Sequence, residues 1–284
     1  MDDLFSYSPP PVAIGGIGGS GTRLVCDIFK SIGFSMGSVL NPSNDNILFS
    51  VLFKNLSILD LDTAQFLTLY QSFSKISQGL PLQSAEINLL TAAIHSNDLF
   101  PEHWKQQVLA LMHEKPQAIS MPWGWKEPNT HRVIERIHEV QPDIKFIYVR
   151  RIGLDMAFSS NQNQLKLWGP QVLGRPVEIS PRDSLSYWCA TQQRMDKVQE
   201  KMGSSYFDLD YDTLCLQPEK IIAELFRFIG KSADKTVINT LSLLVKPPKS
   251  MGRYKNKPLD IFRSADIEYL TDRFGLKMAA NHLI

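Results

Sequence analysis

The chain has 284 residues, 43% of them hydrophobic, which is enough apolar material for one large α/β domain or two small ones. The 30 Lys and Arg nearly balance the 29 Asp and Glu, and the net charge of +1 argues against a nucleic-acid partner. Any anion site must therefore be local. No apolar run of about 18 residues occurs and the first residues are acidic, so we expect no membrane insertion and a cytoplasmic location.

The three cysteines are odd in number and lie far apart in the sequence. None has CxxC spacing, so we predict neither a disulfide framework nor a zinc site, and no metal is expected. We interpret Cys26, Cys189 and Cys215 as reduced, mostly buried packing residues.

The most informative segment is a short apolar run followed by a glycine-rich turn and an amphipathic pattern. Val12 to Gly16 predicts a buried strand, and Ser20 to Ile32 predicts a helix that Gly33 ends. Such a turn aims several backbone N–H groups at one point, and the helix adds the positive end of its dipole. The segment therefore predicts a phosphate-binding loop.

Helical patterns fill the chain from Asn44 to Lys115. An N-cap is expected at Ser43 or Asn44, and a break from Gly79 to Pro81. We interpret residues 44–115 as a helical insertion within a single domain that spans residues 1–284.

Strands and helices alternate through the rest of the chain. Further strands are predicted from Ile119 to Trp125, Lys145 to Val149 and Tyr206 to Asp210. Helices are predicted over residues 129–140, 154–162, 181–202 with Ser180 as N-cap, 218–229 and 232–244, with a turn-rich segment at 168–176. This alternation predicts an α/β fold, an open parallel sheet flanked by helices, with its ligand at the carboxyl ends of the strands.

The glycine-rich turn has three interpretations. Gly16 and Gly21 have the spacing of a Walker A loop, but Thr22 and Arg23 replace its Lys and Ser/Thr, which disfavours a magnesium-dependent NTPase. The string Gly-Gly-Ser-Gly-Thr-Arg-Leu resembles the opening of sugar-nucleotide pyrophosphorylases, although the prolines and lysine that follow in those enzymes are missing. Residues Ser20 to Arg23 also resemble the 5′-phosphosulfate loop of sulfotransferases that use 3′-phosphoadenylyl sulfate (PAPS).

A second segment resembles the same family. The buried run from Lys145 to Arg151, with Ser159 eight residues after the arginine, is similar to the family's 3′-phosphate-binding segment. A strand end delivers a guanidinium fork, and the next helix returns a hydroxyl to the same oxygens; a surface arginine pair after a strand is the alternative. The resemblance implies a 5′-phosphosulfate site at Gly18, Gly19, Ser20, Gly21, Thr22 and Arg23, and a 3′-phosphate site at Arg151 and Ser159.

The string Trp123-Gly-Trp-Lys-Glu-Pro resembles a family segment in which a lysine at a strand end approaches the transferring sulfuryl group. This resemblance assigns Lys126 to charge neutralisation, whereas a lysine facing water is the alternative. Gly19 occupies the position of the basic residue usual in the loop, so Lys126 and Arg23 are the candidate cations.

Two later segments complete the resemblance. The string from Tyr206 to Leu214 is similar to one whose tyrosine lies near the adenine, which implies a nucleotide contact at Tyr211, with core packing as the alternative. The string from Lys249 to Asn256 resembles a loop that closes over the nucleotide, with contacts at Ser250, Gly252 and Arg253, although a basic surface turn would look similar.

The resemblance covers residues 12–255 and implies a P-loop NTPase-like sulfotransferase fold. The implied enzyme moves a sulfuryl group from PAPS to a hydroxyl or amine of a small-molecule, sugar or lipid-type acceptor and releases adenosine 3′,5′-bisphosphate. A P-loop kinase, or a nucleotide-binding scaffold with a degenerate site, is the alternative, motivated by Gly19 and by Ile152-Gly153 in place of Asp-Pro.

The acceptor also needs a general base. The string from Phe34 to Asp45 resembles the region that supplies a base in bacterial sulfotransferases, which makes Asp45 the candidate; helix capping is its other interpretation. His103, His113 and His131 are the remaining candidates.

Overall fold

A computed structural model describes residues 10–276, which divide into two compact units. Within the described part, the first unit comprises residues 10–16, 22–148 and 204–207, and the second comprises 17–21, 149–203 and 208–276. The acidic start of the sequence, on which the expected cytoplasmic location partly rests, lies outside the described residues. None of the described helices is long and apolar enough to cross a membrane. The single-domain organisation stays a prediction.

The strands form one four-stranded sheet in the order β2-β1-β3-β4. Their bounds are β1 Val12–Gly16, β2 Gly124–Lys126, β3 Lys145–Arg150 and β4 Tyr206–Asp210. β1 and β2 are parallel, with Ile14 opposite Lys126, and β1 is buried along its whole length because its residues are small or apolar. The predicted α/β fold with a parallel sheet is confirmed.

The strand predicted from Ile119 is shorter than expected, because β2 begins only at Gly124. Pro122 has no N–H to donate to a neighbouring strand, and Met121 is 50% exposed. The backbone of Ser35 instead joins this segment, accepting from the Gly124 N–H and donating to the Pro122 carbonyl.

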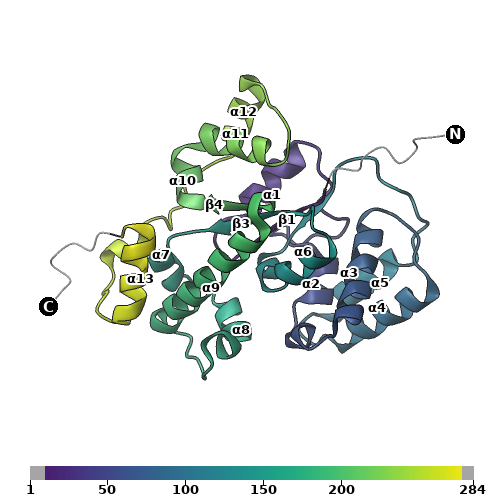
Figure 1. The fold of residues 1–284 in the computed structure, drawn as a ribbon, viewed down its shortest axis with the longest axis horizontal. Helices are drawn as coiled ribbons and strands as arrows, with labels where there is room; N and C mark the ends of the chain where they lie inside the picture. The colour runs from purple at the N-terminus through teal and green to yellow at the C-terminus, as the bar shows by residue number, and fades with distance from the viewer. Residues whose placement is uncertain (1–9, 277–284) are drawn as a thin grey trace. The chain divides into compact units, whose positions relative to one another are not determined.

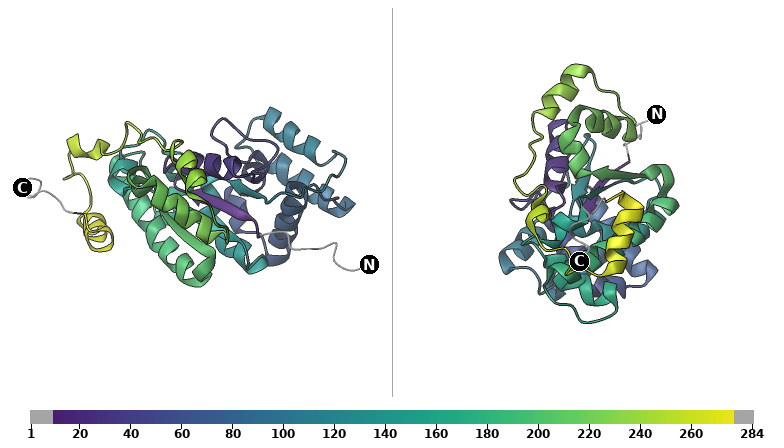
Figure 2. Two further views of the ribbon diagram at one scale, coloured as in Figure 1. Left: turned by 90° about the horizontal axis from the view of Figure 1, so that it is seen from above. Right: turned by 90° about the vertical axis from the view of Figure 1, so that its left-hand side faces the viewer.

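Helices of the first unit include the predicted helical block. The helices are α1 Thr22–Ser31, α2 Ile47–Phe53, α3 Thr63–Ser77, α4 Ser84–Ser96, α5 Glu102–Leu111 and α6 Ile134–Val140, with short 3-10 helices η1 Leu56–Leu59 and η2 Pro128–Arg132. Figure 1 and Figure 2 show α2 to α5 packed side by side. Phe49 stacks on the buried Trp125 at 5.3 Å between ring centroids, so aromatic packing joins this block to β2.

Two boundaries in this unit differ from the prediction. The N-cap of α2 is Asn46, whose side chain accepts from the Phe49 N–H, and not Ser43 or Asn44. Asn44 has a φ of 62° and belongs to a tight loop before the helix. The helix predicted over 129–140 is split into η2 and α6, because the Glu127 side chain caps a separate 3-10 turn that begins at Pro128.

The second unit is helical apart from its strand ends. Its helices are α7 Gly153–Ala157, α8 Asn163–Leu173, α9 Pro181–Met202, α10 Tyr211–Leu216, α11 Pro218–Phe228, α12 Lys235–Ser242 and α13 Ser264–Phe274, with 3-10 helix η4 Arg253–Asn256; the 3-10 helix η3 Gly203–Ser205 precedes β4. The predicted start of α9 is confirmed, since the Ser180 side chain accepts from the Asp183 N–H and Pro181 is the first helical residue. α7 and α8 both pack on α9 (Figure 1).

The turn-rich segment predicted at residues 168–176 is wrong as far as Leu173, because α8 continues through Pro170, and the helix ends in a turn at Gly174. Proline removes one helical hydrogen bond, but the helix buries Leu165 and Trp168, which outweighs that loss. The preceding helix, predicted to reach residue 162, ends at Ala157. Helices α10 and α13 were not predicted.

All three cysteines are free and buried, as predicted. Burial raises the pKa of each thiol, that of Cys26 to about 12, so the reactive thiolate is scarce at neutral pH. We therefore expect the native protein to react slowly with a disulfide reagent such as DTNB at about pH 8. In guanidinium chloride the three thiols should titrate rapidly; fast reaction of one of them in the native protein would contradict their burial.

Candidate active site

The glycine-rich loop runs from Ile17 to Gly21, between the last residue of β1 and the first residue of α1. Gly19 and Gly21 have φ angles of 97° and 103°, which favour glycine. The Ser20 hydroxyl is buried, and among the described residues it has no hydrogen-bond partner. A buried hydroxyl without a partner in a glycine turn can donate to an anionic ligand, and a phosphosulfate group needs such donors.

Two predicted nucleotide contacts lie against this loop within the second unit. A Cβ atom added to Gly21 would be 2.0 Å from the Tyr211 ring, and one added to Gly19 would be 3.7 Å from the Ser159 hydroxyl. Tyr211 is 7% exposed, and burial raises its pKa to about 12. Both residues therefore border the loop backbone, and their predicted roles at the 3′-phosphate and the adenine stay predictions.

Arg151, directly after β3, is 3% exposed and already holds protein partners. Its Nη2 donates to Asp155 Oδ2 at 3.1 Å and its Nη1 donates to Ser250 Oγ at 3.0 Å. Its Nε has no hydrogen bond among the described residues and lies 3.7 Å from an oxygen of Asp212. The guanidinium is thus fixed in place and keeps donors for a further acceptor.

Asp155 ties the predicted C-terminal loop to this arginine. Its fully buried carboxylate accepts from the backbone N–H groups of Gly252, at 2.7 Å, and Tyr254, at 3.2 Å. Arg253 Nε donates to the Ser250 carbonyl at 3.2 Å, so Arg253 and Arg151 both contact Ser250, and burial and the positive charge of Arg151 lower the pKa of Arg253. Such a pair favours an anion between or beside the two charges.

Arg150, by contrast, is engaged elsewhere in the second unit. Its Nε donates to both carboxylate oxygens of Asp208, at 2.9 and 3.0 Å, and its Nη1 pairs with Asp210. The two arginines therefore differ at Nε, which is committed to Asp208 in Arg150 and has no hydrogen bond among the described residues in Arg151.

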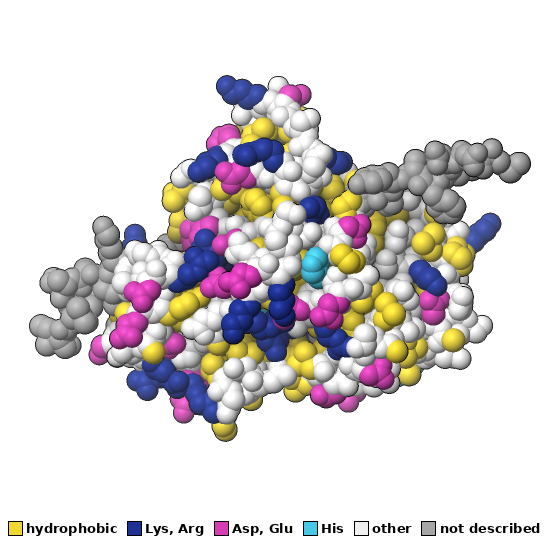
Figure 3. Space-filling model, viewed as in Figure 1, with side chains coloured by type: hydrophobic (Ala, Val, Ile, Leu, Met, Phe, Trp, Pro, Cys, Tyr) yellow, Lys and Arg dark blue, Asp and Glu magenta, His cyan; other side chains and the backbone are white. Residues whose placement is uncertain are grey.

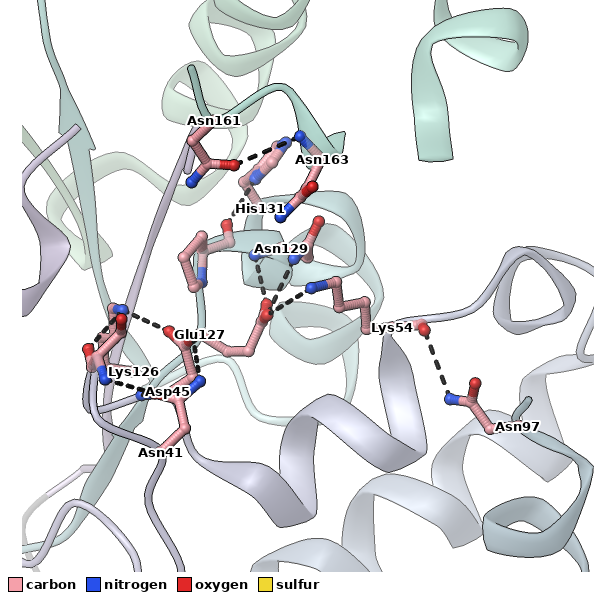
Figure 4. A network of polar contacts seen from close by, with 12 residues as sticks. Asn41, Asp45, Lys54, Asn97, Lys126, Glu127, Asn129, His131, Asn161 and Asn163 are labelled. Carbon is pink, nitrogen blue, oxygen red and sulfur yellow. Dashed lines mark hydrogen bonds and ion pairs between the residues drawn. The ribbon is translucent and has the colours of Figure 1, made fainter. Parts of the chain in front are cut away.

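In the first unit, Lys126 and Asp45 form an ion pair (Figure 4). Lys126 ends β2, is 2% exposed, and donates to the Ser43 carbonyl at 3.0 Å as well as to Asp45. Since Asn46 caps α2, Asp45 is not the helix cap. The pair places a buried ammonium beside a partly exposed carboxylate.

Asn41 holds this carboxylate in position. Its Nδ2 donates to Asp45 Oδ2 at 2.8 Å, while its Oδ1 accepts from the N–H groups of Ser43 and Asp45. Arg23, on the first turn of α1, donates to Ser43 Oγ at 2.7 Å. The three predicted catalytic residues therefore meet at the loop of residues 41–45, which contains Asn41 and Ser43, two contacts that we did not predict.

The other polar groups near this strand end have structural partners. Glu127 is buried, its pKa is raised by that burial, and it accepts from Asn129 and lies 4.0 Å from Lys54 Nζ (Figure 4). His131 is fully buried with Nδ1 2.8 Å from the Pro128 carbonyl. His103 and His113 are exposed.

Charges elsewhere are mixed. On the face drawn in Figure 3, Lys and Arg side chains are interspersed with Asp and Glu. Within residues 10–276, no cluster of three or more His, Cys, Asp or Glu side chains could hold a metal ion.

Comparisons of the sequence and of the structure with known proteins both find sulfotransferases. The sequence profile described as "Sulfotransferase family" matches residues 10–235. The sulfotransferase domain from the curacin biosynthetic pathway is 13% identical over 96% of this chain and 100% of its own, with a TM-score of 0.50. The sulfotransferase domain of the Synechococcus olefin synthase is 13% identical over 98% of this chain and 100% of its own, also with a TM-score of 0.50. A comparison with curated proteins gave no match.

Proposed function

The chain belongs to the sulfotransferase family and is a sulfotransferase, and we propose that it takes the sulfuryl group from PAPS and transfers it to a hydroxyl or amine of a small-molecule, sugar or lipid-type acceptor. The observation that carries the choice of PAPS as sulfuryl donor is the glycine loop, in which the buried Ser20 hydroxyl has no hydrogen-bond partner within residues 10–276. A buried hydrogen-bond donor without an acceptor lowers the stability of the protein unless a ligand supplies the acceptor.

We propose that the second unit binds the adenosine 3′,5′-bisphosphate portion. Residues 18–21, followed in the chain by Thr22 and Arg23, hold the 5′-phosphosulfate, because loop N–H groups and a helix N-terminus favour anions. Arg151, Arg253 and Ser250 hold the 3′-phosphate, since Arg151 and Arg253 both contact Ser250 and Arg151 keeps its Nε unpaired among the described residues. PAPS supplies a sulfuryl group that is activated by its bond to phosphate.

We propose that Lys126 and Asp45 act on the transfer step. Asp45 takes the proton of the acceptor group as that group forms its bond to sulfur. Lys126 stabilises the negative charge that grows on the bridging oxygen as the bond between sulfur and that oxygen breaks. Because the ammonium supplies this positive charge, the proposed step requires no metal ion. Arg23, which is exposed on α1, donates to Ser43 Oγ and so adds a second positive charge at the loop of residues 41–45.

Isothermal titration calorimetry tests the proposal that PAPS is the sulfuryl donor. We expect adenosine 3′,5′-bisphosphate to bind more tightly than ATP with magnesium, because the cluster around Arg151 offers donors to a phosphate at the 3′ position. Tight binding of ATP with magnesium and none of adenosine 3′,5′-bisphosphate would favour a P-loop kinase. Binding without sulfuryl transfer from PAPS to any of a broad panel of acceptors would favour a nucleotide-binding scaffold.

The free cysteines also bear on where in the cell the enzyme works. Three free, buried thiols are typical of proteins in a reducing compartment, and we propose that the enzyme works in the cytoplasm.

A further inference from the structure

Asn161 reaches the glycine loop from the segment between α7 and α8. A Cβ atom added to Gly18 would be 3.2 Å from Asn161 Nδ2, so the amide lies directly beside the loop backbone. The cavity that Gly18 and Asn161 line has a volume of only about 10 Å³, too small for a phosphate, but the Asn161 side chain is exposed to solvent. The amide is therefore both adjacent to the loop and accessible to a ligand.

The orientation of this amide follows from its neighbours. The Asn163 N–H donates to Asn161 Oδ1 at 3.4 Å, and the Asn161 N–H donates to Ser159 Oγ at 3.2 Å. Because the Asn163 N–H needs an acceptor, the oxygen occupies that side, and Nδ2 is turned away from Asn163, as Figure 4 shows. No hydrogen bond between described residues uses Nδ2. The loop thus has an uncommitted donor beside it.

The loop itself is poor in side-chain donors. Residues 17–21 contain no Lys or Arg, and the Ser20 N–H is already used by the Ile17 carbonyl. The Ser20 hydroxyl is the one side-chain donor that these residues contribute. An anion at the loop needs further donors, and Asn161 Nδ2 is placed to provide one.

We propose that Asn161 is a binding residue for the 5′-phosphate or phosphosulfate of the nucleotide, donating from Nδ2 to one of its terminal oxygens. This inference rests on the proposed function. It gives the loop a neutral donor at Gly18 next to the position where Gly19 lacks a basic side chain. An amide orients the anion through a hydrogen bond without neutralising its charge, so its contribution is to binding and alignment.

Calorimetry with two nucleotides tests the contact. Asn161→Ala should weaken binding of adenosine 3′,5′-bisphosphate about tenfold, because one hydrogen bond to a charged oxygen is lost. Binding of adenosine 3′-monophosphate, which lacks the 5′ group, should not change. Asn161→Asp should weaken adenosine 3′,5′-bisphosphate further, because its carboxylate repels the anion.

Asn163→Ala is the matched control, since Asn163 is an exposed asparagine two positions further on, at the start of α8, and its backbone N–H, not its side chain, donates to Asn161. It should leave both affinities unchanged. The inference is overturned if wild type and Asn161→Ala bind adenosine 3′,5′-bisphosphate equally, or if the variant loses equal affinity for both nucleotides. Neither result contradicts PAPS as the sulfuryl donor. A wild-type protein that binds neither nucleotide overturns the proposed function instead.

Discussion

Lys126→Ala is expected to lower kcat about 100- to 1,000-fold, the usual cost of removing a preorganised group that stabilises transition-state charge. The affinity for adenosine 3′,5′-bisphosphate should change by about threefold or less, because the growing charge exists only during transfer. The ammonium is 2% exposed and is held by the Ser43 carbonyl and the Asp45 carboxylate, so its position at the end of β2 is fixed. Steady-state kinetics and calorimetry give the two quantities separately.

Lys30→Ala is the matched control for this variant. Lys30 lies on α1 and is exposed, and its Nζ reaches only Asn44 Oδ1 at 3.5 Å within the described residues. Its kcat should stay close to that of the wild type. A loss of nucleotide affinity as large as the loss of kcat in Lys126→Ala would make Lys126 a binding residue and not a catalytic one.

Asp45→Asn separates the two members of the pair. It should lower kcat strongly, because an amide cannot take the acceptor proton. If Lys126 and Asp45 act together, the double variant loses much less than the product of the single losses. Losses that multiply would show independent roles.

Local signals in the sequence were sufficient for much of the fold. The start of α9 was predictable because Ser180 and Pro181 are a cap and a first-turn residue that act within a few positions of each other. The course of α8 was not, because Pro170 and Gly169 indicate a turn locally and the burial of Trp168 depends on tertiary packing.

The sequence allowed the residues of the candidate site to be predicted, but not the contacts between their side chains. Lys126, Asp45 and Arg23 were identified one by one through resemblance to a family. Their meeting at the loop of residues 41–45 depends on contacts between residues that are far apart in the sequence, by 20 positions for Arg23 and Ser43 and by 81 for Asp45 and Lys126. Asn41 lies within the string from Phe34 to Asp45 that resembles the family, but it was assigned no role there, and its importance follows from three hydrogen bonds within one loop. Such side-chain bonds are set by backbone geometry that composition and periodicity do not encode.

Arg151→Lys should weaken binding of adenosine 3′,5′-bisphosphate about 10- to 100-fold, because lysine keeps the charge but loses the guanidinium fork. Alanine is the poorer choice here. Asp155 is fully buried beside Arg151, and stranding one partner of a buried ion pair costs about 3–5 kcal/mol of stability, which would obscure the effect on binding. Lysine retains a cation for that carboxylate.

The choice of ligand isolates the 3′-phosphate. Adenosine 5′-monophosphate lacks that group, so its affinity should be nearly the same in the wild type and in Arg151→Lys. The matched control is Arg150→Lys at the neighbouring position, where the guanidinium is committed to Asp208 and Asp210. This control should lower the melting temperature through its lost ion-pair geometry and leave both affinities unchanged. If Arg150→Lys, and not Arg151→Lys, discriminates between the two nucleotides, the 3′-phosphate site belongs to Arg150, and the cluster around Asp155 serves only to hold the loop of residues 250–254 in place.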